Sequence, residues 1–441
     1  MTFTTTRRTL LTGAASAAAL ALAGCSTGAK PTGTAGATAT GAGFTAWGLT
    51  GGTSETTFRA SFAEWNTANP NAQVKAEFFA NDAFKEKIRT AVGSGNAPTL
   101  IYSWAGGTLR DYVANNKVVD LTGKLTTLEP RLVTSVLDTG KVNGKLYAVP
   151  NNNAQPVILY YNKDLFTKAG IAAVPQTFDE LLDAVAKLKA SGVTTPIALA
   201  GQSVWPELMW IEYLADRIGG PEAFNAVVDG KADAWKNTAF VDALTKIKQL
   251  VDAGAFGDKF GSVTADSGAD VALIHTGKAG MLLQGAWVYG TFLTDAPDFL
   301  KAGKLGYANF PSVSGGKGDA KNIVGNPANF WSVSATASAE AQASAIKYLN
   351  EFMFNDAYVD GLIKGGSVPV TNDAEAKIKA SDQADFLGFA YGMVKAAPNF
   401  QLSWDQALSA TAAQALLTNL SQVFLGSKTP QQFADAMAAV K

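Results

Sequence analysis

From residue 44 onward, short apolar runs alternate with longer segments in which apolar residues recur every three or four positions. In the segment TSETTFRASFAEWNTANPN, Phe58, Phe62 and Trp65 have the spacing of one helix face, and the pattern stops before Pro70. The runs on either side, FTAWGL and AQVKAEFFA, are typical of strands. Strands separated by helices favour parallel pairing with right-handed crossovers. The pattern therefore predicts an α/β fold.

Further strand–helix units follow, and helices then predominate. The segment 82–98 reads as a helix with Phe84, Ile88 and Val92 on one face, and TLIYSW after it reads as a buried strand. Helices are predicted over most of 207–254 and from 339 onward, with the buried strand KAGMLLQGAW and a turn-rich strand region between them. A chain of 441 residues is long for one ordinary domain and suits two lobes.

The N-terminal stretch reads as an export signal. Arg7 and Arg8 precede an alanine-rich apolar segment that is too short for a membrane span, and small residues then lead to Cys25, the only cysteine. The sequence before Cys25 resembles a bacterial lipobox, which implies a lipid on that residue. The paired arginines resemble a twin-arginine signal, with general secretion as the alternative. We expect an export signal over 1–24 and a flexible Gly/Ala/Thr tether over 25–43, holding the protein at the outer face of the cytoplasmic membrane.

The composition excludes several kinds of ligand and metal site. Without Arg7 and Arg8, 34 basic side chains face 37 acidic ones, scattered along the chain. This balance gives nucleic acid and anionic lipid no electrostatic advantage and favours a neutral ligand. With one cysteine and one histidine, His275, thiolate zinc sites and histidine-cluster metal sites are excluded. We therefore expect no metal and no cofactor.

The order of several segments resembles one family. These segments are the lipobox, FAEWNTANP, DAFKEKIRTAV, TLIYSWAGG, LYAVPNNNAQPVILYYNKDLF, TFDELLDAVAKL, GKAGMLLQGAW and YLNEFMF. Together they resemble the extracellular solute-binding proteins of bacterial ABC transporters, in the carbohydrate-binding group similar to maltose-binding protein. The resemblance covers essentially the whole chain after Cys25, although no single motif is diagnostic.

This resemblance implies two α/β lobes that close by hinge motion around a ligand. Carried onto this chain, it places an N-lobe at 44–152 and 315–352 and a C-lobe at 153–312 and 355–441. It implies a monomer that captures a solute, catalyses no reaction, and delivers the solute to a membrane permease driven by a separate ATPase. We expect a neutral mono- or oligosaccharide, most simply a di- or oligosaccharide because candidate stacking rings are numerous.

A neutral sugar stacks its C–H faces on aromatic rings and needs hydrogen bonds for its hydroxyls. Trp47, Trp104 and Trp287 each end a strand-like run beside glycines, where open α/β sheets bind ligands. Trp205 precedes a proline that would start a helix, and Trp404 follows an irregular segment. These five tryptophans are candidate ligand contacts, with packing inside a lobe as the alternative for the three at strand ends.

The polar candidates are Asp82, Glu207, Asn153 and Asn326. Asp82 matches a turn that supplies a sugar-hydroxyl acceptor in the family, but it could equally cap a helix. Glu207 falls in the first turn of a predicted helix, where an acid is favoured in any case. Amides such as Asn153 and Asn326 both donate and accept hydrogen bonds, although the run Asn151–Asn153 could instead satisfy backbone groups at the hinge.

Two other functions remain open. A non-sugar solute is one, and Tyr160-Tyr161 could suggest a ferric-iron binder, but successive strand residues point to opposite faces. An exported glycoside hydrolase is the other, because it needs only two carboxylates. Against the hydrolase, the element order does not resemble an eightfold βα repeat.

Overall fold

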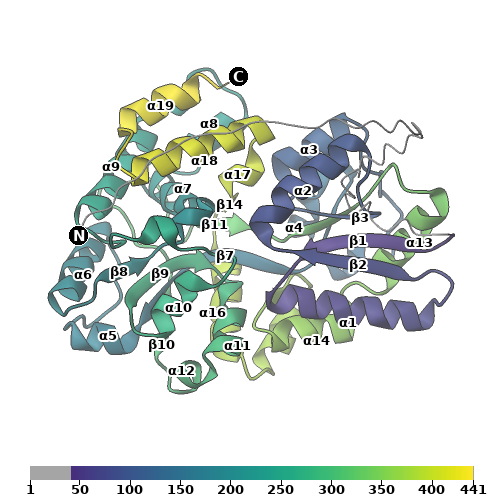
Figure 1. The fold of residues 1–441 in the computed structure, drawn as a ribbon, viewed down its shortest axis with the longest axis horizontal. Coiled ribbons are helices and arrows are strands. Elements are labelled where there is room, and N and C mark those ends of the chain that lie inside the picture. The colour runs from purple at the N-terminus through teal and green to yellow at the C-terminus, as the bar shows by residue number, and fades with distance from the viewer. Residues whose placement is uncertain (1–40, 441) are drawn as a thin grey trace, which may run out of the picture. The chain divides into compact units, whose positions relative to one another are not determined.

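The computed structural model describes residues 41–440. The predicted export signal, Cys25 and the tether up to residue 40 lie outside the described residues. Two mixed β-sheets with helices on their faces form the framework, as the alternating pattern predicted (Figure 1). Within residues 41–440, no helix combines the length and apolar character needed to cross a membrane.

The first sheet has five strands in the order β2-β1-β3-β12-β6. Strand β1 pairs in parallel with β2 and β3, whereas β12 runs antiparallel to β3. Figure 1 shows α1 and α14 on one side of this sheet and α2 and α3 on the other. We call this half the first lobe. Its elements are β1 Phe44–Leu49, α1 Gly52–Ala68, β2 Val74–Phe79, α2 Asn81–Ser94, β3 Leu100–Ser103, α3 Gly106–Ala114, α4 Thr134–Asp138, the hairpin β4 Lys141–Val142 and β5 Lys145–Leu146, β6 Val149–Pro150, β12 Phe330–Val333, α13 Ala339–Glu351 and α14 Asp356–Lys364.

The second sheet runs β14-β11-β7-β9-β8, and β10 and β13 also pair with β7. The long strand β7 is antiparallel to β9, β10 and β11, so only β8–β9 and β11–β14 are parallel pairs. We call this half the second lobe. Its strands are β7 Asn153–Asn162, β8 Thr195–Ala198, β9 Ala279–Gly285, β10 Leu305–Ala308, β11 Ile323–Asn326, β13 Val368–Pro369 and β14 Phe400–Leu402. Its helices are α5 Lys163–Lys168, α6 Phe178–Ala190, α7 Trp205–Gly219, α8 Glu222–Val228, α9 Thr238–Asp252, α10 Ala269–His275, α11 Val288–Asp295, α12 Pro297–Lys301, α15 Ala374–Lys379, α16 Ala384–Ala396, α17 Trp404–Ala407, α18 Ala410–Phe424 and α19 Pro430–Ala438.

The chain passes between the sheets at adjacent places. It leaves the first sheet after β6 and enters the second at β7, and it returns between β11 and β12. Asparagines join these crossings: the Asn151 N–H donates to the Asn329 carbonyl at 2.7 Å, and the Asn329 N–H donates to Asn152 Oδ1 at 2.9 Å. Amides thus satisfy backbone groups here, one of the two roles considered for this asparagine run. Strand β11, within the predicted N-lobe range, belongs to the second sheet, and α14, within the predicted C-lobe range, packs on α1.

Two buried cores hold these layers. In the first lobe, the buried Phe44 packs against Trp65 and Tyr348, with ring centroids 5.7 and 5.8 Å apart. The buried Trp331 packs against Phe58 at 5.3 Å. The amphipathic face predicted from residues 58–65 is therefore the face that α1 buries. The second core fills the space between the second sheet and helices α6, α7, α9, α18 and α19.

Candidate ligand-binding cleft

Two adjoining cavities lie between the lobes. The larger, about 970 Å³, runs between α2 and α3 of the first lobe and α17 and α18 of the second, and we call it the outer groove. The smaller, about 560 Å³, reaches the crossing segments, and we call it the inner chamber. Both volumes lie in the range of small-molecule sites. The two cavities meet at shared lining residues, Lys85, Tyr102, Trp104, Trp205, Asp405 and Gln406.

One aromatic wall comes from the first lobe. Trp104 follows β3 at its carboxyl end, and its ring packs edge-on against Tyr102 at 5.5 Å and Phe84 at 6.0 Å. Ala105 and Gly106 after it both have positive φ, 62° and 63°, which turns the chain sharply into α3. The turn lets α3 begin beside the second lobe and leaves Trp104 at the carboxyl end of β3, where it lines both cavities.

The opposite aromatic wall comes from the second lobe, where the rings of Trp205 and Trp287 lie 6.0 Å apart. Trp287 comes two residues after β9, and Gly285 makes room for it, because a Cβ there would lie 1.8 Å from the indole ring. Trp205 begins α7 directly after Val204, whose φ of 62° is strained for a β-branched residue. Strain of this kind persists where the surroundings enforce it, and here it adjoins the cleft.

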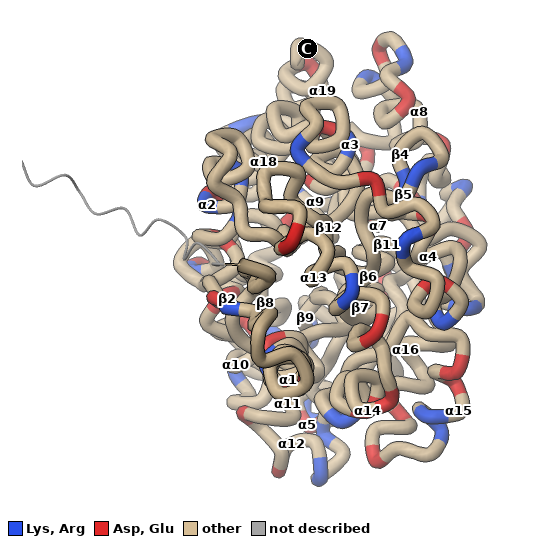
Figure 2. The backbone as a smooth tube through the Cα atoms, turned by 90° about the vertical axis from the view of Figure 1, so that its right-hand side faces the viewer, with Lys and Arg blue, Asp and Glu red and all other residues tan. Residues whose placement is uncertain are grey.

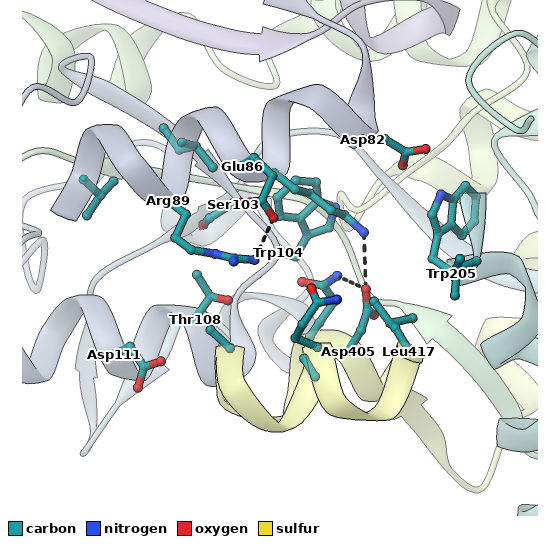
Figure 3. A pocket seen from close by; sticks show the side chains of 18 of the residues that line it. Asp82, Glu86, Arg89, Ser103, Trp104, Thr108, Asp111, Trp205, Asp405 and Leu417 are labelled. Atoms are coloured by element: carbon teal, nitrogen blue, oxygen red, sulfur yellow. Dashed lines mark hydrogen bonds and ion pairs between the residues drawn. The ribbon is translucent and has the colours of Figure 1, made fainter. Parts of the chain in front are cut away.

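An ion pair spans the junction of the two cavities. Lys85 Nζ lies 3.3 Å from Asp405 Oδ2, and we call this contact the Lys85–Asp405 bridge. The same ammonium lies 5.7 Å from the Trp104 ring and 6.0 Å from the Trp205 ring. Figure 3 shows the two tryptophans approaching the bridge from different elements. Gln406 Nε2 donates to the same Asp405 oxygen at 2.8 Å, so the carboxylate is held from two sides.

Amides and carboxyls line the inner chamber. The amide residues are Asn81, Asn152, Asn153, Gln155, Gln284, Asn326, Asn329 and Gln406. Gln284 Nε2 donates to Asp270 Oδ2 at 2.9 Å, and burial of Asp270 raises the pKa of its carboxyl to about 6. A second contact joins the lobes nearby: the Asp82 N–H, in the first turn of α2, donates to Asp266 Oδ2 at 3.0 Å. Burial, with the Asp82 charge as a smaller cause, raises the pKa of Asp266.

The structure brings six of the nine sequence-predicted ligand residues to these cavities: Asp82, Trp104, Asn153, Trp205, Trp287 and Asn326. Ala80 occupies the N-cap position of α2, so Asp82 is not the cap considered as its alternative role. The Asn326 Oδ1 and Trp205 Nε1 atoms are buried and have no hydrogen-bond partner among the described residues. Buried polar atoms of this kind call for an explanation, which a ligand could supply.

The other three candidates lie away from both cavities. Trp47 precedes the end of β1 by two residues and is 5 % exposed, packed on Phe79 at 5.5 Å. Trp404 is fully buried, stacked on Phe224 at 4.2 Å, with its Nε1 donating to Gln401. Glu207 is fully buried in α7, and burial raises the pKa of its carboxyl to about 8. These residues belong to the lobe cores in this structure.

Sequence reasoning missed several cleft residues. Lys85 lies three positions after Asp82 on α2, so helix spacing alone places both on one face and could have identified it. Asp405 directly follows the candidate Trp404 in the sequence, but only the tertiary structure shows that it reaches Lys85. Asp270 and Gln284 lie on α10 and β9, and only the tertiary fold shows that they touch.

A two-lobed α/β chain with an aromatic and amide-lined cleft between its lobes defines a solute-binding protein. Residues 51–360 match the family of bacterial extracellular solute-binding proteins, and the chain belongs to this family. It is 27 % identical over 371 residues to the xylose/arabinose-binding protein XacG of Haloferax volcanii, covering 82 % of this chain and 75 % of the relative.

Solved structures agree. A protein described in work on xylan utilisation by the thermophilic bacterium Caldanaerobius polysaccharolyticus superposes with a TM-score of 0.80 at 32 % identity, covering 90 % of this chain and 98 % of the other. A chitin oligosaccharide binding protein superposes with a TM-score of 0.79 at 24 % identity, covering 90 % and 97 % of the two chains. This second likeness concerns the fold. The two-lobed solute-binding fold implied by the sequence is therefore confirmed.

Proposed function

We propose that this chain is the solute-binding component of an ABC importer, capturing a neutral di- or oligosaccharide in the interlobe cleft and delivering it to a membrane permease without catalysing a reaction. The observation that carries this proposal is the pairing of Trp104 from one lobe with Trp205 and Trp287 from the other across an amide-lined chamber. Aromatic rings offer stacking surfaces for sugar C–H faces, and amides match hydroxyls, which donate and accept.

Charge supports a neutral ligand. Lys85 lies in the centre of the cleft, and Asp405 neutralises its charge in the Lys85–Asp405 bridge. Figure 2 shows basic and acidic residues interspersed along the chain. A phosphate or carboxylate ligand would favour unpaired cations in the cleft. The relatives that bind xylose and arabinose or take part in xylan use point to pentose-based sugars as the first candidates.

We propose export with a lipid on Cys25, a monomeric state, and an N-lobe of 44–152 and 327–366 with a C-lobe of 153–326 and 367–440. These limits differ from the sequence-based ones because β11 pairs within the second sheet and α14 packs on α1.

The test is titration of the purified protein with xylose, arabinose, xylobiose, xylotriose, maltotriose and chitobiose, followed by tryptophan fluorescence and calorimetry. We expect saturable binding of one sugar class that Trp104→Ala or Trp205→Ala weakens about tenfold or more, since stacking and burial of one ring contribute more than about 1.4 kcal/mol. Trp47→Phe, which lies outside both cavities, is the matched control and should bind as the parent does. Absence of binding across the panel, or sustained hydrolysis of chromogenic glycosides, would refute the proposal.

A further inference from the structure

The short helix α17 of the second lobe contacts the first lobe at two of its four positions. Asp405 pairs with Lys85 of α2, and the Ala407 carbonyl accepts a hydrogen bond from Arg110 Nη2 of α3 at 2.6 Å. Gln406, between them, donates to the Asp405 carboxylate, and both residues line the two cavities (Figure 3). The position of α17 therefore decides how this part of the cleft wall meets the first lobe.

A buried carboxyl of α7 holds the start of this helix. Glu212 is fully buried, and its Oε1 accepts from the Trp404 N–H at 2.7 Å and from Ser403 Oγ at 2.8 Å. Ser403 occupies the N-cap position of α17, but its side chain makes no capping bond within that helix. The first N–H groups of a helix need acceptors from outside it, and a helix of four residues is too short to be stable by itself. Glu212 supplies such an acceptor.

We infer that Glu212 is a positioning residue for ligand capture, which fixes the turn at 403–404 from inside the second lobe and thereby sets Asp405 against the first lobe. This inference rests on the proposed function, because it names a residue that shapes the cleft without touching the ligand. Glu212 lines neither cavity, so its effect on affinity has to pass through α17.

The surroundings of Glu212 indicate which property of its side chain matters. Burial raises the pKa of its carboxyl to about 8, although the hydrogen bonds from Trp404 and Ser403 act in the opposite direction. The Oε2 atom is buried without a hydrogen-bond partner among residues 41–440. The acceptor Oε1, rather than a negative charge, therefore makes the interaction at neutral pH.

Three substitutions separate reach, charge and size. Glu212→Gln keeps the acceptor oxygen at the same reach, Glu212→Asp keeps the carboxyl but withdraws it by one methylene, and Glu212→Met keeps the size but removes the acceptor. The matched control is Glu207→Met in the same helix. Glu207 is also fully buried, both of its carboxyl oxygens have no hydrogen-bond partner in the described part of the chain, and it lines neither cavity.

The experiment measures calorimetric Kd values for xylose, arabinose, xylobiose, xylotriose, maltotriose and chitobiose, together with thermal unfolding of each variant. For the sugar that binds the parent, Glu212→Gln and the control should stay within about twofold of the parent Kd. Glu212→Asp and Glu212→Met should weaken binding about fivefold or more, because α17 loses its fixed position. Glu212→Asp carries the test if Glu212→Met does not fold.

A cycle with Lys85→Met supplies a readout that a purely structural role of Glu212 would not move. Because Glu212 and Lys85 act through the same Asp405, the loss of affinity caused by Glu212→Asp should be smaller in the Lys85→Met background by more than about twofold. Unchanged Kd values in both Glu212→Asp and Glu212→Met, additive losses in the cycle, or an equal loss in the control would overturn the inference and leave the proposed function standing. Failure of every sugar to bind the parent would overturn both.

Discussion

Gly107→Ala should open the cleft, because Gly107 of the first lobe packs directly against the backbone of the second lobe. A Cβ built on Gly107, in α3, would lie 1.8 Å from the carbonyl oxygen of Leu408, directly after α17. Ordinary Cβ contacts begin near 3.4 Å, so the two backbones would have to separate by about 1.6 Å. Arg110 reinforces the same contact, since its Nη2 donates to the Ala407 carbonyl at 2.6 Å.

The strain falls on the contact between the lobes, which a small rotation about the crossing segments would relieve. Overpacking by a methyl group typically costs about 1–3 kcal/mol, which as a penalty on closure weakens ligand binding about 5- to 150-fold. The assay is sugar titration by tryptophan fluorescence, together with small-angle scattering of the free protein. We expect a weaker Kd, a larger radius of gyration, and thermal unfolding close to that of the parent.

Gly388→Ala is the matched control, since it lies in helix α16 with nothing within 4 Å of the added methyl group. It should leave the Kd unchanged and raise the free energy of unfolding by up to about 1 kcal/mol through helix propensity. If Gly107→Ala bound sugar as tightly as the parent with an unchanged scattering profile, the contact between α3 and α17 would not limit closure, and the reasoning would be refuted.

Three further outcomes follow from buried groups. Because the folded-state pKa of Glu207 is about 8, above the ordinary 4.5, the folded protein retains a proton that the unfolded chain loses, so the free energy of unfolding should fall by up to about 1.4 kcal/mol per pH unit between these values. Urea unfolding of Glu207→Gln at pH 5 and pH 8 should show a smaller fall in the free energy of unfolding between these pH values than the parent shows. Part of the fall should remain, because burial also raises the pKa of Glu212 to about 8. A fall as large as that of the parent would contradict the assignment. Trp404→Ala should lower the free energy of unfolding by about 3–5 kcal/mol, measured in the same way, because it removes a stacked core ring; a loss of sugar affinity without a loss of stability would instead make it a ligand contact. Asp270→Asn should abolish any change of sugar Kd centred near pH 6 in calorimetric titrations, and a change that persists in the variant would assign it to another group.

Periodicity by itself determined the element types and much of the core. The face of Phe58, Phe62 and Trp65 is the face that α1 buries, since a helix stripe of that width has to be covered by another layer. The parallel pairing of β1 with β2 and β3 followed from the helices between them. The antiparallel placement of β7 did not, because it depends on where the chain crosses between sheets, and no local pattern encodes that.

The sequence likewise predicted some of the cleft residues and not others. Proximity to a strand end was enough to locate Trp104 and Trp287, because the carboxyl ends of strands face the crevice of such a sheet. The same rule was insufficient for Trp47, because β1 continues for two residues beyond it.

Only the tertiary structure decided where each side chain points and which residues it contacts. Trp404 and Asp405 are neighbours in the sequence, yet one stacks inside the second core and the other reaches Lys85 across the cleft. Successive residues at a helix start point in different directions, and which direction is core depends on segments hundreds of positions away. Residue chemistry could therefore nominate the tryptophans and carboxylates, but long-range packing determined which of them line the cavities.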